Sequence, residues 1–450
     1  MRIRTWIGAC AIAVMAGAPV TAQSLADTFV AAYRNSDLLE QNRALLRAAD
    51  EDVAQAVSRL RPVIDYVVSS TYSDSSVGDD VVTNAGLEAS LLLYDFGATQ
   101  LTIDLQKETV LALREALVDI EQNVLLRAAS AHLNVGRNSA NVALQENNVR
   151  LISEQLRAAQ DRFEVGQITR TEVSIAEARL ASSRSSFAAA QGALAQSREE
   201  YKRVTGVYPR QLASALRQPD IPRTEAEARA VARKNHPAIK EAQRNVLVAE
   251  LGVAVARAAL NPTLTGTASV TAGSERSSQS IGIRLSGPIY RGGNLSSVIR
   301  RAQANRDASR STLHIVHRDI DREVGFAWAD LAVAVASQNA ADEEVRAARL
   351  ALRGIREEFE VGQVTTLDVL DREQELLDAQ TRLLSAQTDR VIAIYALLDS
   401  VGLLTVKHLG LGITTYDPSA YYNAVKDAPT VYVSPQGERL DRVLKRLNRE

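Results

Sequence analysis

Cysteine is nearly absent from this chain of 450 residues, which contains only Cys10. That cysteine lies in an N-terminal segment with the three parts of a cleaved secretory signal, and cleavage is expected after about Ala22. Without residues 1–22 the mature chain has no cysteine and forms no disulfide, so packing or oligomerisation must hold it together. The alternative is a lipoprotein signal with Cys10 lipidated, but only nine residues precede that cysteine.

Aromatic residues, prolines and net charge are also scarce. Aromatics make up 4% of the chain, there are 11 prolines, and the formal net charge is −2. Such a balance lacks the basic excess of nucleic-acid-binding proteins, so we expect no nucleic acid as a partner. Abundant Ala, Leu, Gln, Arg and Glu are typical of long helices and coiled coils rather than of compact enzyme domains. After the N-terminal segment no apolar run is long enough to predict a transmembrane helix.

What the chain does contain is a repeat. The pentapeptide FEVGQ occurs at Phe163–Gln167 and again at Phe359–Gln363, 196 positions later. At the same offset, YDFG at Tyr94–Gly97 aligns with YRGG at Tyr290–Gly293. The sequence is therefore a tandem duplication of one unit.

Each unit has the same predicted order of helix, β-hairpin, long helix and short helix. The first unit, 23–206, has its hairpin at 63–94, its long helix at 97–163 and its short helix at 168–206. The second unit, 224–402, has its hairpin at 263–290, its long helix at 293–359 and its short helix at 365–402. A linker at 207–223 separates the units, and a tail follows at 403–450. The opening stretches, Leu25–Arg61 and Glu225–Leu260, are each predicted to form one helix, stopped by a proline.

The strands and the long helices are predicted from periodicity. In the second hairpin Ile281, Ile283 and Leu285 alternate with other residues, so one face meets an apolar environment and the other meets water. Each long helix lacks proline and would be about 100 Å long. Gly166 and Gly362 are expected in the left-handed conformation that ends a helix. The turn that follows makes each long and short helix a helical hairpin.

Four strands in one chain cannot close a barrel. An open sheet in a membrane would leave edge groups unpaired in hydrocarbon, at a cost of several kcal/mol each, so chains must pool their strands. Two copies would give an eight-stranded barrel filled by side chains, whereas three copies would give twelve strands and an open lumen. We expect the trimer.

Taken together, the duplicated unit, the YDFG and YRGG junctions, the FEVGQ turns and the tail LGLGITTYDPSAYYNAVKDAP resemble the TolC-like outer-membrane factors. The resemblance covers nearly the whole mature chain. It implies a mostly α fold with membrane β-hairpins, in which a homotrimer builds a 12-stranded outer-membrane β-barrel continuous with a long periplasmic α-helical barrel. It also implies tip-first docking onto a periplasmic adaptor and an inner-membrane pump, either an ABC exporter or a proton-driven pump. The transported class would be secreted protein, small molecules or both, and the non-lipidated N-terminus and the TolC-type tail favour type I protein secretion over a dedicated drug-efflux role.

The resemblance also assigns roles to residues. A ring of acidic side chains would narrow the periplasmic entrance, and the matching positions are Glu172, Asp368 and Asp371. Phe359 is a gate position at which many relatives have tyrosine. Three copies of these carboxylates around one axis would repel each other and bind cations. The alternative is that the acids only favour the N-terminal end of their helix through its dipole. The expected adaptor-docking tips are Val165, Gly166, Gln167, Val361, Gly362 and Gln363, and the expected strand–helix junctions are Tyr94, Gly97, Tyr290 and Gly293.

No enzyme activity, cofactor or metal is expected. His314 and His317 have the helical spacing of two metal ligands, but no third ligand lies near them in the sequence. The competing function is a non-conducting periplasmic coiled-coil scaffold or adaptor, which would have no use for the alternating hairpins.

Overall fold

The computed structural model describes residues 23–75, 78–213, 219–273, 277–430 and 442. The expected signal segment, its cleavage position and most of the chain after residue 430 lie outside this description. The helices are α1 (Leu25–Asn35), α2 (Asp37–Ser58), α3 (Ala98–Glu164), α4 (Arg170–Thr205), α5 (Glu225–Asn235), α6 (Pro237–Ala258), α7 (Asn294–Glu360), α8 (Thr366–Ser400) and α9 (Pro418–Val425). The strands are β1 (Val63–Ser75), β2 (Gly78–Tyr94), β3 (Thr263–Gly273) and β4 (Ser277–Ser286).

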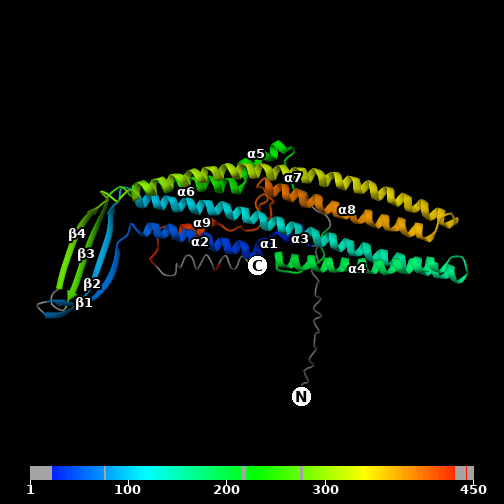
Figure 1. Ribbon diagram of the computed structural model, residues 1–450, viewed down its shortest axis with the longest axis horizontal. Coiled ribbons are helices and arrows are strands. Elements are labelled where there is room, and N and C mark those ends of the chain that lie inside the picture. Colours follow the sequence, from blue (N-terminus) through cyan, green and yellow to red (C-terminus); the bar gives the residue numbers. More distant parts are fainter. Residues whose placement is uncertain (1–22, 76–77, 214–218, 274–276, 431–441, 443–450) are drawn as a thin grey trace, which may run out of the picture.

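The molecule is long and thin, with the strands at one end and the tips of two helical hairpins at the other (Figure 1). Helices α3 and α7 are continuous over 67 residues each, which corresponds to about 100 Å. Neither contains a proline, which would remove a backbone donor and clash with the preceding turn. Both helices therefore run without a break from the strand end to the tips.

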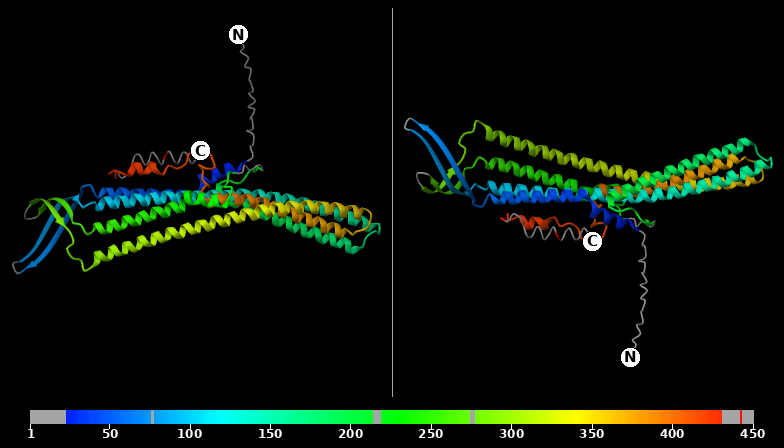
Figure 2. Two further views of the ribbon diagram at one scale, coloured as in Figure 1. Left: turned by 90° about the horizontal axis from the view of Figure 1, so that it is seen from above. Right: turned by 90° about the horizontal axis from the view of Figure 1, so that it is seen from below.

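Shorter helices pack beside these two. Nearer the strands, α6 contacts both α3 and α7, and α2 packs against α3. Nearer the tips, α8 contacts both α3 and α7, and α4 packs against α3. Figures 1 and 2 show that the helices form a row rather than a compact bundle around one core. Helices α6 and α8 thus occupy successive halves of the same gap.

The strands form one antiparallel sheet in the order β1-β2-β3-β4. Each repeat supplies one hairpin, and the pairing of β2 with β3, which sets Leu87 opposite Val270, joins the two repeats. Within the described residues, β1 and β4 each pair on one side only. The sheet therefore has two open backbone edges.

The two faces of this sheet differ in chemistry. The register aligns one cross-strand row that is entirely apolar, made of Ile64, Ala89, Ala268 and Ile281. The next row lies on the opposite face and is polar, made of Asp65, Glu88, Ser269 and Ser280. Ile281 and Ile283 on the apolar face are 90% and 73% exposed. One face is thus suited to an apolar environment and the other to water.

The prediction of one continuous opening helix in each repeat is wrong. The first stretch is broken at Ser36, whose side chain accepts a hydrogen bond from the N–H of Leu39 at 3.2 Å and so caps α2. The second is broken at His236, which has extended dihedrals and precedes Pro237, the first residue of α6. A residue before proline is driven away from the helical region, which explains the second break.

The main buried core lies near the middle of the long axis. It joins α1, α3, α4 and α8, and its fully buried side chains include Leu125, Tyr201 and Leu398. Leu404 and Val406, from the segment after α8, complete it. The segment directly after α8 therefore packs at mid-length, whereas α9 lies against α2, and Arg61, next to the start of β1, donates to the carbonyl of Ala428.

Gly402 brings the end of α8 against the start of α6. Its φ is 76°, and a Cβ there would lie 2.7 Å from the Cα of His236. Gly362, at the tip, has the same φ of 76°, but a Cβ added to it would meet nothing within 4 Å. The left-handed backbone conformation favours glycine at both positions. At position 402 there is also no room for a Cβ atom, whereas at position 362 there is.

We expect Gly402→Ala to destabilise the protein by roughly 2–4 kcal/mol, since it adds a clash with backbone to the strain of a left-handed residue. Gly362→Ala should cost only the strain, about 1–2 kcal/mol. The measurement is the urea midpoint of the purified protein. Gly354→Ala, inside α7 with nothing within 4 Å, is the control and should be neutral or slightly stabilising. Equal losses at positions 402 and 362 would contradict the packing argument.

Candidate functional site

The two helical tips have the same backbone structure. At the first tip the N–H of Gly166 donates to the carbonyl of Phe163 at 2.9 Å, and the N–H of Gln167 donates to the carbonyl of Arg162 at 2.9 Å. The second tip repeats this pair of bonds from Gly362 and Gln363, at 3.0 and 2.9 Å. A left-handed glycine with this bonding is the Schellman ending of a helix, which satisfies the last carbonyls.

Each tip exposes an apolar side chain. Val165 and Val361 are 69% and 70% exposed. They occupy equivalent positions, one residue before the left-handed glycine of each turn. The far end of the molecule therefore presents two matching apolar points on rigid turns.

Two of the predicted gate acids cap helices. Asp368 accepts hydrogen bonds from the backbone N–H and the hydroxyl of Thr365, at 2.8 and 2.7 Å, and completes a capping box at the start of α8. Glu172 makes the equivalent box with Thr169 at the start of α4. The hydroxyl of Thr365 is the main cause that lowers the pKa of Asp368 below its ordinary value of 3.8. Within one chain, these contacts match the alternative role considered for the two acids, which is to stabilise the N-terminal end of their own helix.

Asp371 instead joins the two hairpins. Its Oδ1 lies 2.5 Å from Nη2 of Arg179, so the pair links α8 to α4. Both side chains are partly exposed, at 48% and 40%. Sequence analysis did not identify Arg179, because the two residues are 192 positions apart and nothing local indicates their contact.

Phe359 makes a second link between the hairpins. The guanidinium carbon of Arg162, near the end of α3, lies 4.5 Å from the centre of the Phe359 ring near the end of α7. A cation over an aromatic face is attracted by the ring quadrupole. The long helices are thus tied at their tips by one contact, and the short helices by another.

An ion pair with a buried carboxylate holds the second hairpin together. The side chain of Glu373 is 1% exposed, and Nη2 of Arg356 lies 3.0 Å from its Oε1. Burial raises the pKa of Glu373, and the hydrogen bond from Arg356 opposes that rise. Because α7 carries the arginine and α8 the carboxylate, the pair fixes the register of the two helices. Glu373 was also missed from sequence, since burial of one acid among many on a helix leaves no local signal.

The two strand–helix junctions are not identical. Tyr94 is the last residue of β2, and its ring lies 4.7 Å from that of Phe96. Tyr290 lies beyond the end of β4, outside the strand, and is 86% exposed. Gly97 and Gly293 precede α3 and α7 with φ of 83° and 82°. The glycine turn is therefore shared between the repeats, whereas the tyrosine position is not.

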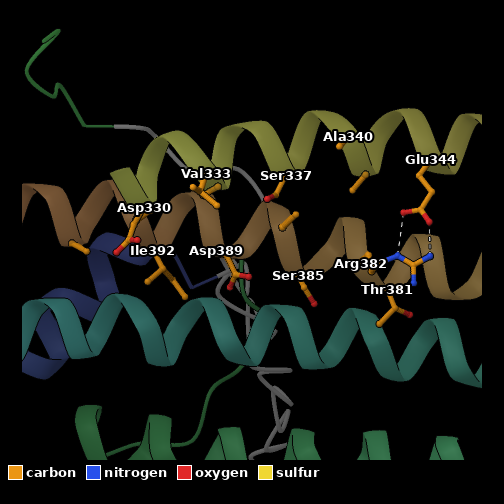
Figure 3. A pocket seen from close by; sticks show the side chains of 15 residues that line it. Asp330, Val333, Ser337, Ala340, Glu344, Thr381, Arg382, Ser385, Asp389 and Ile392 are labelled. Atoms are coloured by element: carbon orange, nitrogen blue, oxygen red, sulfur yellow. Dashed lines mark hydrogen bonds and ion pairs between the residues drawn. The ribbon is translucent and has the colours of Figure 1, made fainter. Parts of the chain in front are cut away.

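A groove of about 960 Å³ lies between α7 and α8 (Figure 3). Alanines and serines make up much of its lining, and the ion pair of Glu344 with Arg382, at 2.5 Å, lies at one end (Figure 3). Asp389, on the α8 side, is also 3.7 Å from Nη1 of Arg137 on α3. Among the described residues, no cluster of three or more His, Cys, Asp or Glu side chains is arranged to hold a metal ion. In the same part of the chain, no helix has the length and apolar character needed to cross a membrane.

Comparisons with known proteins agree with this architecture. The family described as Outer membrane efflux protein matches residues 30–207 and 229–403, one stretch in each repeat. The chain is 34% identical over 423 residues to Outer membrane efflux protein BepC of Brucella suis, covering 92% of this chain and 93% of that protein. It is 25% identical over 404 residues to Outer membrane protein TolC of Vibrio cholerae, covering 86% and 92%.

Solved structures share the fold. The CmeC outer membrane channel of Campylobacter jejuni superposes with a TM-score of 0.76 at 16% identity, over 90% of this chain and 89% of that one. At such low identity the similarity concerns the fold alone.

We expect Thr365→Ala to loosen the first turn of α8, because it removes the hydroxyl that both donates to Asp368 and accepts from its N–H. The pKa of Asp368 should rise toward 3.8. A carboxyl whose pKa is lower in the folded than in the unfolded protein stabilises the fold at every pH above its unfolded pKa. The contribution of Asp368 is therefore present at neutral pH and is lost as the pH falls through the pKa of the folded protein. Amide hydrogen exchange at residues 366–370 should be faster in Thr365→Ala at pH 7 and unchanged in Thr365→Ser. Equal exchange in all three proteins would contradict the capping role.

Proposed function

This chain belongs to the outer membrane efflux protein family, and we propose on that premise that it is a trimeric export duct of the outer membrane. Its apolar sheet face contacts lipid, and its helices extend into the periplasm. The observation that carries the proposal is the sorting of apolar and polar rows onto opposite faces of a four-stranded sheet with two open edges. In hydrocarbon those edges require partner strands, because each unpaired group costs several kcal/mol.

Further copies of the chain supply the missing neighbours. Three sheets joined edge to edge form a barrel of twelve strands, with the apolar rows outside and the polar rows facing the lumen. The row of helices continues the wall in the same way. Large apolar side chains on the outermost long helix are exposed in one chain, among them Ile315, Phe326 and Leu350 at 48%, 61% and 63%. Contact with a second copy covers such side chains.

The tips are the docking end. Val165 and Val361 offer two apolar contacts on turns held by Schellman bonds, and the partner is a periplasmic adaptor that connects the duct to an inner-membrane pump. An ABC exporter and a proton-driven pump are both compatible with a passive duct. The 34% identical relative is named an efflux protein, which favours efflux over protein secretion for this chain.

The entrance is narrowed by acids near the tips. Asp368 and Asp371 lie one turn apart on α8, and Glu172 lies at the start of α4. Around a threefold axis these carboxylates form rings that repel one another and attract cations. The ion pair of Arg179 with Asp371 restrains α4 against α8 within each chain, so it opposes widening of the entrance.

We expect the purified protein to form ion-conducting pores in planar bilayers. Ile283→Arg places a charge on the apolar face of β4 and should abolish assembly in membranes, at a cost of about 2–4 kcal/mol for each copy. Ser280→Arg, on the polar face of the same strand, is the matched control and should still give pores. Wild-type protein without pores would instead favour a non-conducting coiled-coil scaffold, and equal insertion of both variants would contradict the assignment of the faces.

We expect Arg179→Asp to raise the basal conductance of these pores, because two acids then face each other where an ion pair held the hairpins together. Adding Asp371→Arg restores opposite charges and should return the conductance toward that of the wild type. Arg372→Ala is the control, since Arg372 pairs with Glu375 on its own helix, α8. Unchanged conductance in Arg179→Asp, or no recovery in the double variant, would remove the pair from the gating mechanism.

A further inference from the structure

A polar cavity lies where α8 ends and α6 begins. Both helices fill the gap between α3 and α7, and Gly402 brings their ends into backbone contact at His236. The cavity has a volume of about 350 Å³ and is lined from α3, α7, the end of α8 and the start of α6. It lies at the opposite end of α8 from the acids at the tips, and none of the interactions described above uses it.

Three carboxylates line this cavity without a basic partner among them. Asp119 comes from α3, Glu323 from α7 and Asp399 from the last turn of α8. No ion pair is formed by any of the three within the described residues. Like charges gathered in a partly buried site disfavour their own ionisation.

A buried amide in the same lining has an unsatisfied donor. Gln122 on α3 is 1% exposed, and its Nε2 has no hydrogen-bond partner. Leaving such a donor unpaired costs about 1–3 kcal/mol. The cavity therefore combines an orphan donor with carboxylate acceptors, groups that an ordered water can bridge.

His236 adds a second neutral donor. Its Nδ1 accepts the N–H of Ala238 at 3.2 Å and caps α6, so the neutral ring carries its proton on Nε2. Burial lowers the pKa of His236 to about 4, and the charge of Lys240 acts in the same direction. The ring therefore stays neutral near pH 7 and supplies no positive charge to offset the carboxylates.

We propose that this cavity is a proton-binding site, in which Asp399 holds a proton beside the carboxylates of Asp119 and Glu323, and that loss of the proton loosens the junction of α8 with α3, α6 and α7. The proposal goes beyond the export function and does not depend on it. The groups that face the site or act on its members are Asp119 on α3, Lys240 and Glu241 on α6, Glu323 on α7, Asp399 on α8, and His236 between α5 and α6. From α5, Arg233 is already bound to Asp321 of α7, at 2.7 Å.

The energetics agree with the geometry. Burial, followed by the charges of Asp119 and Glu323, raises the pKa of Asp399 from 3.8 to about 7. Burial also raises the pKa of Asp119. A folded pKa above the unfolded value stabilises the junction at low pH, and this stabilisation is lost as the pH rises through about 7.

The fold does not demand an acidic site at this place. At the offset of 196 between the repeats, Arg203 corresponds to Asp399 and Arg127 corresponds to Glu323. In the first repeat both arginines bind Glu200, each at 2.9 Å. At the equivalent place the charged residues are therefore joined in ion pairs, whereas the junction at the end of α8 gathers acids that form no ion pair within the described residues.

The test is an infrared titration of the purified full-length protein between pH 5 and pH 9, which detects the carbonyl stretch of protonated carboxyl groups. We expect a component of this band that disappears with a midpoint near pH 7 in the wild type and is absent from Asp399→Asn, whereas the carboxyl of Asp50, whose pKa burial raises to about 6, titrates in both proteins. Asp389→Asn, on the same helix but at an acid paired with Arg137, is the matched control and should keep the band. Asp119→Asn removes a like charge, so it should shift the midpoint to lower pH.

Hydrogen exchange at residues 236–240 and 399–403, corrected for the intrinsic effect of pH, reports the junction itself. Opening at the site should increase about tenfold between pH 6 and pH 8 in the wild type, and this increase should be lost in Asp399→Asn. The proposal is overturned if no carboxyl component titrates near pH 7, or if that component or the exchange difference persists in Asp399→Asn. Should that variant not fold, an unshifted midpoint in Asp119→Asn would overturn it equally. The conductance of these variants in bilayers tests the export function alone, so a normal conductance neither supports nor contradicts the proton site.

Discussion

Sideways packing between helices is the interaction on which the rest of this structure depends. A row of helices has no single centre, so each helix buries side chains only along the flanks that touch its neighbours. Helices α3 and α7 run the full length, and α6 and α8 fill the gap between them in succession. The row is therefore weakest where one short helix ends and the next begins. The main core, which includes Leu404 and Val406 of the tail, lies at the same position along the long axis.

Duplication accounts for the regularity, and divergence after duplication accounts for the chemistry. Both repeats keep the left-handed glycine at the tip, the capping box of the short helix and the glycine before the long helix. Charges have not been kept. Arg203 and Asp399 occupy equivalent positions with opposite sign, and the salt-linked pair Arg179–Asp371 joins one repeat to the other. The two repeats thus share the same backbone structure, but equivalent positions in them carry different charges.

Periodicity and repetition made much of this fold predictable. The absence of proline and the shared offset of the turns identified the long helices, and alternation in residues such as Ile281 and Ile283 identified the strands. The breaks at Ser36 and His236 were missed although both have local signals, a capping serine and a following proline. Arg179 and Glu373 could not have been found in this way. Their importance comes from contacts between elements far apart in the chain, which only the assembled structure brings together.

The unbroken length of α3 and α7 gives the molecule the mechanics of a pair of rods held near their midpoints. The main core holds α3 near its middle, and a second buried cluster with Ile320 and Val324 holds α7, so each half of either helix is an arm of about 50 Å on that pivot. One degree of tilt at the pivot then displaces a tip by about 0.9 Å, so a swing too small to disturb packing at mid-length moves the Gly166 and Gly362 turns by several ångströms. Leverage of this kind lets close-packed helices transmit motion that their side-chain contacts could not accommodate locally.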